Sequence, residues 1–179
     1  GVEIMPYKSF FTPLLGEFLL DLGGTVSSRV TQDYRSVFEH QKTNLKLGPV
    51  ICYESIYGEF VTEYVRDGAH FFTIITNDGW WGNTAGHKQL LSYARLRAIE
   101  NRRDIVRSAN TGISVIINAK GEITDKLPYD FKGVLKGKFA PQERITFYTK
   151  YGDYIARWSG FISVLFFLIA VSGRLKKRS

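Results

Sequence analysis

Residues 158–173 carry no charged side chain and are almost entirely apolar, and this run restricts the chain more than any other feature. Extended back through Ile155, it approaches the roughly 20 residues with which a helix crosses a bilayer. The alternative is a core helix that is buried on every side. That alternative is weaker, because an apolar helix that ends in the basic stretch 174–178 is unusual in a small domain. The sequence therefore predicts a transmembrane helix over residues 154–173.

The residues on either side of this run predict its orientation. Tyr151, Tyr154 and Trp158 form an aromatic belt before it, and a basic tail, residues 174–179, follows it. Aromatic side chains gather at membrane surfaces, and segments rich in Lys and Arg stay in the cytoplasm. We therefore expect a lipid bilayer as partner, a cytoplasmic tail, and residues 1–150 as a globular part on the outer face of the membrane.

The overall charge does not indicate a nucleic-acid partner. The formal net charge is +7, but part of the excess lies in the basic tail and much of the rest is scattered. A nucleic-acid footprint would place Lys and Arg on one face among aromatic side chains that stack on bases. The aromatic residues here fall in apolar runs instead, so we expect no nucleic acid as a partner.

The globular part has the alternation of an α/β domain. Two short apolar runs, Leu47–Tyr53 and Phe71–Thr76, predict buried strands. Between them, apolar side chains recur at helical spacing over residues 55–66. This order predicts a parallel βαβ unit, whose functional groups gather where the strands end. Residues 1–46 show no such pattern, and we expect them to be irregular.

A longer helix and several short strands are expected next. The helix is predicted over residues 86–103, with Asn83 or Thr84 as its cap. Its buried stripe is expected to contain Leu90, Leu91, Ala94, Ala98 and Ile99. Residues 106–118 predict two strands split by a turn, and alternating apolar and basic residues over 133–139 predict a further strand. Antiparallel hairpins beside a βαβ unit would make the sheet mixed.

Cys52 is the single cysteine and the strongest candidate for a catalytic side chain. A lone cysteine is by default a small buried residue. This one, however, ends a predicted strand immediately before a helix, where backbone N–H groups stabilise a thiolate and a developing oxyanion. Glu54, two residues later, is placed to accept or donate a proton.

The histidines do not point to a catalytic triad or a metal site. His40, His70 and His87 lie at spacings typical of neither, and we expect each on the surface or at a helix end. With one cysteine and no cluster of His and Asp residues, the sequence predicts no metal and no cofactor.

Four motifs together resemble the nitrilase superfamily. Residues 48–55 read GPVICYES, residues 76–82 TNDGWWG, residues 93–103 YARLRAIENRR and residues 107–112 RSANTG. The closer resemblance is to the membrane branch of the superfamily, apolipoprotein N-acyltransferase. The double tryptophan and the trailing apolar run distinguish that branch from the soluble amidases. The resemblance covers most of the chain and is weakest over its opening part.

The resemblance implies a nitrilase-like four-layer αββα sandwich, of which residues 1–150 would be the C-terminal part. It also implies an N-acyltransferase of the bacterial inner membrane, with the catalytic domain on the periplasmic face. A phospholipid would donate an acyl chain to the cysteine as a thioester. The α-amino group of the diacylglyceryl-cysteine that begins an apolipoprotein would then accept it.

The same motifs imply roles for individual residues. Cys52 matches the nucleophile, Glu54 the acidic residue beside it, and Glu3 the acidic residue just downstream of the catalytic lysine. Tyr53 matches the residue whose backbone N–H helps to bind the oxyanion. The family's lysine and general-base glutamate would precede this chain, so we expect its 179 residues to be a C-terminal fragment that is inactive alone.

Other interpretations stay open. Trp80 and Trp81 either line an acyl pocket or anchor the core. The chain could be a membrane-tethered nitrilase-type amidase that hydrolyses a small amide, or an inactive membrane-anchored fragment of the fold. The double tryptophan, the apolar segment Pro13–Leu20 and the terminal apolar run favour the acyltransferase. Residues 10–20 either form a lid or pack on the core.

Overall fold

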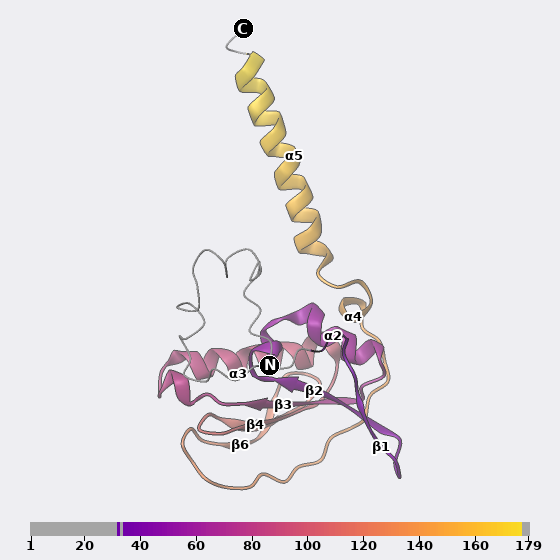
Figure 1. The fold of residues 1–179 in the computed structure, drawn as a ribbon, viewed down its shortest axis with the longest axis vertical. Coiled ribbons are helices and arrows are strands. Elements are labelled where there is room, and N and C mark those ends of the chain that lie inside the picture. The colour runs from indigo at the N-terminus through magenta and orange to yellow at the C-terminus, as the bar shows by residue number, and fades with distance from the viewer. Residues whose placement is uncertain (1–31, 33, 177–179) are drawn as a thin grey trace.

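Within the part of the chain that the structure describes, six strands form one mixed sheet (Figure 1). The computed structural model describes residues 32 and 34–176, with side chains through residue 173. The strands lie side by side in sequence order: β1 (Phe38–His40), β2 (Leu45–Ile51), β3 (Phe71–Thr76), β4 (Ile105–Ala109), β5 (Ser114–Ile117) and β6 (Ile123–Leu127). Strands β2, β3 and β4 run parallel, whereas β1, β5 and β6 are antiparallel to their neighbours. The predicted mixed sheet is confirmed.

Two helices cover one face of this sheet. Helix α2 (Gly58–Arg66) joins β2 to β3, and α3 (Ala85–Asn101) joins β3 to β4. Because crossovers between parallel strands are right-handed and these strands advance across the sheet in one direction, both helices lie on the same side (Figure 1). Thr84 caps α3 as predicted, and its hydroxyl oxygen accepts a hydrogen bond from the Gly86 N–H at 3.3 Å.

The hydrophobic core fills the space between the helices and the sheet. Every second strand residue points toward the helices. The buried side chains include Val50, Phe72, Ile74 and Ile105 from the strands, and Val61, Val65, Leu91, Ala94 and Ala98 from the helices. Gly48 shows how closely α2 approaches the sheet. A Cβ at this position would lie 2.8 Å from the Phe72 ring and 3.0 Å from Tyr64.

The predicted buried stripe of α3 is wrong at one residue. Ile99 is 40% exposed, whereas Asn101 on the same helix is fully buried. The reason is a short helix, α4 (Phe147–Tyr151), whose Thr149 hydroxyl donates a hydrogen bond to Asn101 Oδ1 at 3.0 Å. This contact from a distant segment covers a polar face of α3 and leaves Ile99 outside.

The opposite face of the sheet is largely open. Ile51 and Ile75 pair across β2 and β3, and they are 43% and 58% exposed. The segment 128–146 crosses part of this face, where Phe139 stacks on Phe71 with ring centroids 4.1 Å apart. The described residues thus supply one helix layer and one sheet layer of the αββα arrangement that the sequence led us to expect.

Two expectations about strands are wrong. Residues 133–139 form no strand, and Val134 is 92% exposed, because this segment finds no backbone ladder partner and returns instead toward α4 (Figure 1). Conversely, β1 lies inside the opening part that we expected to be irregular. All of β1 is exposed, so it carries no apolar alternation, and it is held by pairing with β2.

The terminal apolar run forms a helix that stands away from the globular part, α5 (Tyr154–Lys176) (Figure 1). Residues 154–173 are long and apolar enough to cross a membrane, and none of this span is buried. The described residues thus bury no part of this helix, and its place in a membrane stays a prediction. At the base of α5, Arg157 donates a hydrogen bond to Glu59 on α2 at 2.6 Å. This bond ties the first turn of α5 to the globular part.

Candidate active site

Cys52 occupies a sharp corner at the carboxyl end of β2. Strand β2 ends at Ile51, and Cys52 begins a short 3₁₀ turn, η2 (Cys52–Ile56). Its φ angle is +52°, in the left-handed region that residues other than glycine rarely adopt. Such a conformation costs about 1–2 kcal/mol for a residue with a Cβ. The predicted position of Cys52 between a strand and a helical turn is confirmed, and the corner points its side chain out of the strand.

Glu54 braces this corner. Its carboxylate accepts a hydrogen bond from the Ile51 N–H at 2.7 Å, and the Ser55 hydroxyl donates to the Cys52 carbonyl at 2.8 Å. Glu54 is buried, and it lies close enough to Tyr64 to affect its phenol. Burial, and secondarily the Glu54 charge, raise the pKa of Tyr64 to about 12. Glu54 therefore fixes the turn through the backbone, and its role in proton transfer stays a prediction.

Behind Cys52 lies a buried polar chain that the sequence analysis missed. The Thr76 hydroxyl lies 3.4 Å from Cys52 Sγ and 2.7 Å from Asp78 Oδ1. The other oxygen of Asp78 accepts a hydrogen bond from Arg107 at 2.7 Å. Asp78 and Arg107 are both almost fully buried, so this is an ion pair removed from water. The Arg107 guanidinium also donates to the Ile113 carbonyl.

The sequence contained a weak signal for this row of hydrogen-bonded side chains. Arg107 stands at an inward-facing position of the buried strand β4, where an arginine requires a partner. Asp78 lies in the loop after β3, and the register that pairs Thr76 with Ala109 brings the two strand ends together. The pairing itself needed that register, which no local pattern reveals.

The loops that follow β3 and β4 are tied together around Asp78. A Cβ at Gly112 would lie 2.2 Å from Asp78 Oδ2, so the second loop touches the carboxylate with its backbone. Asn77 accepts hydrogen bonds from the Gly79 N–H at 3.2 Å and from the Asn110 side chain at 3.5 Å. The segment 110–112 thus acts as turn structure at the edge of the site.

Aromatic side chains lie in the turns next to Cys52. The rings of Tyr53 and Trp81 lie 6.3 Å apart between centroids. Trp81 rests on Gly86, where a Cβ would lie 2.7 Å from its ring, and it remains 39% exposed. Trp80 is 67% exposed. Neither tryptophan is a core anchor, and both stand in the short turn η3 (Gly79–Trp81) next to the cysteine's turn.

Other expected residues lie elsewhere. Glu3 and the segment 10–20 lie outside the described residues. His40 is exposed, and His70 accepts a hydrogen bond from the Lys46 N–H. His87 lies in the first turn of α3 but is fully buried against Tyr129, with ring centroids 4.6 Å apart. Its expected place at a helix end is therefore confirmed, although Tyr129 covers the start of the helix and the ring is buried.

Comparisons with known proteins give the same family. The model of the carbon-nitrogen hydrolase family matches residues 5–146. An apolipoprotein N-acyltransferase of Chlorobaculum tepidum is 35% identical over 176 residues, covering 96% of this chain and 33% of that protein. The enzyme of the same name in Haemophilus influenzae is 32% identical, covering 84% of this chain and 28% of that protein. The chain thus spans about a third of the length of these relatives.

Solved structures with a similar fold are more distant. A carbon-nitrogen hydrolase from Helicobacter pylori superposes with a TM-score of 0.48 at 15% identity, covering 56% of this chain and 41% of that one. Nit3 of Saccharomyces cerevisiae, of the nitrilase superfamily, gives 0.46 at 18% identity, covering 57% and 40%. Because the family model matches well over half of the sequence, the chain belongs to the carbon-nitrogen hydrolase family, and its sequence resembles that of the apolipoprotein N-acyltransferases within it.

Proposed function

We propose that this chain carries the nucleophile of an apolipoprotein N-acyltransferase, an enzyme that moves an acyl chain from a phospholipid to the amino terminus of a lipoprotein. The observation that carries the proposal is the position of Cys52, at a left-handed corner where a parallel strand meets a helical turn. The names of the relatives supply the class of reaction. The activity belongs to the longer protein, of which these residues are one part.

In the first step, the Cys52 thiol loses its proton to a base and the sulfur attacks the carbonyl carbon of a phospholipid acyl ester. The tetrahedral oxyanion collapses, the carbon–oxygen bond to glycerol breaks, and lysophospholipid leaves as an alcohol with the proton that the base had taken. The backbone N–H of Tyr53, the residue after the nucleophile, is our candidate oxyanion donor. Following the resemblance, we assign the base and the lysine to sequence outside these 179 residues.

In the second step, the α-amino group of the diacylglyceryl-cysteine attacks the thioester carbonyl. The carbon–sulfur bond breaks, an amide forms, and the nitrogen gives its proton to the base, which regenerates the cysteine. Water would compete with the amine at this stage. The exposed rings of Tyr53, Trp80 and Trp81 around the corner are suited to hold an acyl chain and to limit that competition.

Thr76 is placed to serve both forms of the cysteine. Its single hydroxyl proton can point to Asp78 or to Cys52 Sγ, but not to both at once. While Cys52 is a thiol, the sulfur can donate to the Thr76 oxygen and the hydroxyl can donate to Asp78. When the sulfur becomes a thiolate, the hydroxyl can turn and donate to it. The buried pair of Asp78 and Arg107 keeps this threonine in place.

Helix α5 supports a substrate that is found in a membrane. Its residues 154–173 could span a bilayer, and the basic residues 174–178 would then remain in the cytoplasm. We propose on this basis that residues 1–150 face the periplasm of the bacterial inner membrane as the C-terminal part of the catalytic domain. The exposed face of the sheet near Ile51 and Ile75 would receive the other sheet of the αββα sandwich.

Mass spectrometry of the peptide that contains Cys52 tests the proposal. The full-length protein, incubated with phospholipid vesicles without acceptor, should gain the mass of one acyl group on Cys52. The thioester should disappear on addition of a diacylated lipopeptide, which should become triacylated. Cys52→Ala should abolish both signals. An unmodified Cys52 under these conditions would refute the proposal.

A tethered amidase is the alternative from another class of function. It predicts that the full-length protein releases ammonia from small aliphatic amides and forms only short-lived, small acyl adducts. The exposed rings of Tyr53, Trp80 and Trp81 and helix α5 favour the acyltransferase, since hydrolysis of a small amide requires neither. Turnover of such amides without acylation from phospholipid would establish the alternative.

A further inference from the structure

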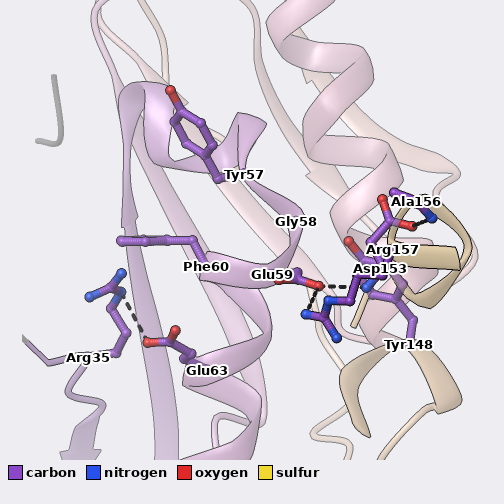
Figure 2. A pocket seen from close by; sticks show the side chains of 10 residues that line it. All are labelled: Arg35, Tyr57, Gly58, Glu59, Phe60, Glu63, Tyr148, Asp153, Ala156 and Arg157. Carbon is purple, nitrogen blue, oxygen red and sulfur yellow. Dashed lines mark hydrogen bonds and ion pairs between the residues drawn. The ribbon is translucent and has the colours of Figure 1, made fainter. Parts of the chain in front are cut away.

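A pocket of about 550 Å³ lies between α2 and the base of α5 (Figure 2). We call it the junction pocket. Its walls come from α2, from α4 with the first turn of α5, and from Arg35, which precedes β1. This volume lies within the range of small-molecule sites, about 300–1,000 Å³. The pocket is separate from the Cys52 corner, although Tyr57, which follows η2, lines it.

On one side, the junction pocket holds a charge pair with unused hydrogen-bonding capacity. Arg35 Nε and Glu63 are 3.6 Å apart, longer than a hydrogen bond, and Arg35 Nε is buried without a hydrogen-bond partner among the described residues. The guanidinium carbon lies over the Phe60 ring, 3.6 Å from its centroid. Arg35 is thus oriented by stacking rather than by its carboxylate, which leaves its donors available for another group.

The opposite side holds a second unused donor. A Cβ at Gly58 would lie 2.2 Å from both Arg97 Nη1 and the Tyr148 hydroxyl, so these polar atoms lie together against the Gly58 backbone. Arg97 is almost fully buried, and its Nη1 has no hydrogen-bond partner within residues 32 and 34–176. Gly58 and Tyr148 line the junction pocket. A buried guanidinium nitrogen therefore lies behind Gly58 at the edge of this pocket, with no hydrogen-bond partner among the described residues.

The junction pocket continues into an apolar groove on α5. A hollow of about 380 Å³ is lined by Arg157, Trp158 and Phe161, and Arg157 belongs to both sites. The junction pocket is thus lined by polar and charged groups, whereas the adjoining hollow on α5 is lined by aromatic side chains. Both lie along a helix that is suited to a bilayer. An amphipathic molecule would fit both parts, with its headgroup on α2 and its chains along α5.

We propose that the junction pocket binds the headgroup of a bilayer phospholipid that carries both a phosphate and an ammonium, as in phosphatidylethanolamine. Such a zwitterion would replace the long contact between Arg35 and Glu63 with two short charged hydrogen bonds, phosphate to Arg35 and ammonium to Glu63. A purely anionic headgroup fits less well, because it would leave Glu63 without a cation and would face Asp153, while Arg157 is already paired with Glu59. The assignment rests on the proposed insertion of α5 in a bilayer, and it concerns a site apart from the acyl transfer at Cys52.

Native mass spectrometry of retained lipid tests this assignment. The full-length protein with Cys52→Ala, which cannot be acylated there, is reconstituted in nanodiscs of equal phosphatidylethanolamine and phosphatidylglycerol and then released. We expect at least a five-fold preference for phosphatidylethanolamine. Arg35→Gln should lower retention of both lipids about ten-fold, since a charged hydrogen bond is lost. Glu63→Gln should remove the preference while retaining lipid. Lys150→Gln, which removes an exposed charge from α4 outside the pocket, should match the parent.

The outcomes separate the pocket from the enzyme. Equal retention of the two lipids by the parent, or a preference for phosphatidylglycerol, would overturn the assignment, as would Arg35→Gln and Glu63→Gln variants that behave like the parent. Both substitutions leave the hydrogen bond between Glu59 and Arg157 intact, so α5 stays attached. Thioester formation on Cys52 in protein that shows no lipid preference would refute the pocket alone. A lipid preference in protein that forms no thioester would refute the enzyme alone.

Discussion

The buried ion pair behind Cys52, the proposed nucleophile, gives the sharpest quantitative prediction. Replacing Asp78 with Asn keeps an acceptor for the Thr76 hydroxyl but leaves the Arg107 guanidinium buried without a counter-charge. We expect Asp78→Asn to destabilise the protein strongly. It should also weaken the hydrogen bond that positions the Thr76 hydroxyl beside Cys52. Adding Arg107→Met should restore part of the stability, because it removes the uncompensated charge.

The magnitude follows from the burial and the distance. Two unit charges 2.7 Å apart attract by about 6 kcal/mol at an effective dielectric constant of about 20. Desolvation of both groups offsets much of that attraction, but breaking a buried pair by removing one partner costs about 3–5 kcal/mol. We therefore expect a loss of about 3–5 kcal/mol for Asp78→Asn, and a double variant that is more stable than the single one by about 1–2 kcal/mol.

The assay is equilibrium unfolding of the full-length protein in detergent, followed by tryptophan fluorescence. Asp67→Asn is the matched control: Asp67 is exposed at the end of α2, and its substitution should change stability by less than about 0.5 kcal/mol. The reasoning fails if Asp78→Asn costs less than about 1 kcal/mol. It also fails if Arg107→Met makes the Asp78→Asn protein less stable, since the uncompensated charge would then not be the cause.

Three further predictions concern the same site. Gly112→Ala should cost about 1–3 kcal/mol in a thermal melt, because the new Cβ would overlap Asp78, which must then move. Cys52→Gly should be more stable than Cys52→Ala by about 0.5–1 kcal/mol, since glycine relieves the left-handed strain at some cost in chain entropy; equal stabilities would argue against strain at the corner. Folding raises the pKa of Tyr64 from 10.0 to about 12, so the stability due to its neutral phenol is present below pH 10 and is lost as pH rises through 12. In a tyrosinate absorbance titration, Tyr64→Phe should remove the step near pH 12 and Glu54→Gln should lower its midpoint, whereas an unshifted step would show that the Glu54 charge does not act on Tyr64.

Local patterns in the sequence were sufficient for the elements that build the corner. The apolar runs of β2 and β3 have few alternatives to buried strands, and the order of strand and helix then places Cys52 at a strand end. Local patterns were insufficient where a contact far along the chain decides the structure. Residues 133–139 alternate as a strand would but find no partner, and β1 lacks alternation but pairs with β2.

The same distinction separates the nucleophile from its support. Cys52 could be recognised in a short stretch of sequence, whereas Thr76, Asp78 and Arg107 become neighbours only through the parallel register of β3 and β4. Trp80 and Trp81 were assigned to the site from a motif, but only burial shows that neither is a core residue. For Glu54, the neighbouring sequence suggests proton transfer. The structure adds a second role, because its carboxylate accepts a hydrogen bond from the Ile51 N–H and stabilises the turn.

The contact between Glu59 and α5 connects the helix suited to a bilayer with the turn that holds Cys52. One oxygen of Glu59 accepts hydrogen bonds from Arg157 at 2.6 Å and from the Asp153 N–H at 2.7 Å. Gly152 must lie close to that oxygen, since a Cβ there would be 2.3 Å from it. Glu59 stands in the first turn of α2, which follows η2 after a single residue. The start of the bilayer-suited helix is therefore fixed to the helix that begins at the nucleophile's own turn. If α5 is embedded, this contact sets how far from the bilayer Cys52 is held, so the depth at which the proposed nucleophile would meet an acyl ester follows from the fold.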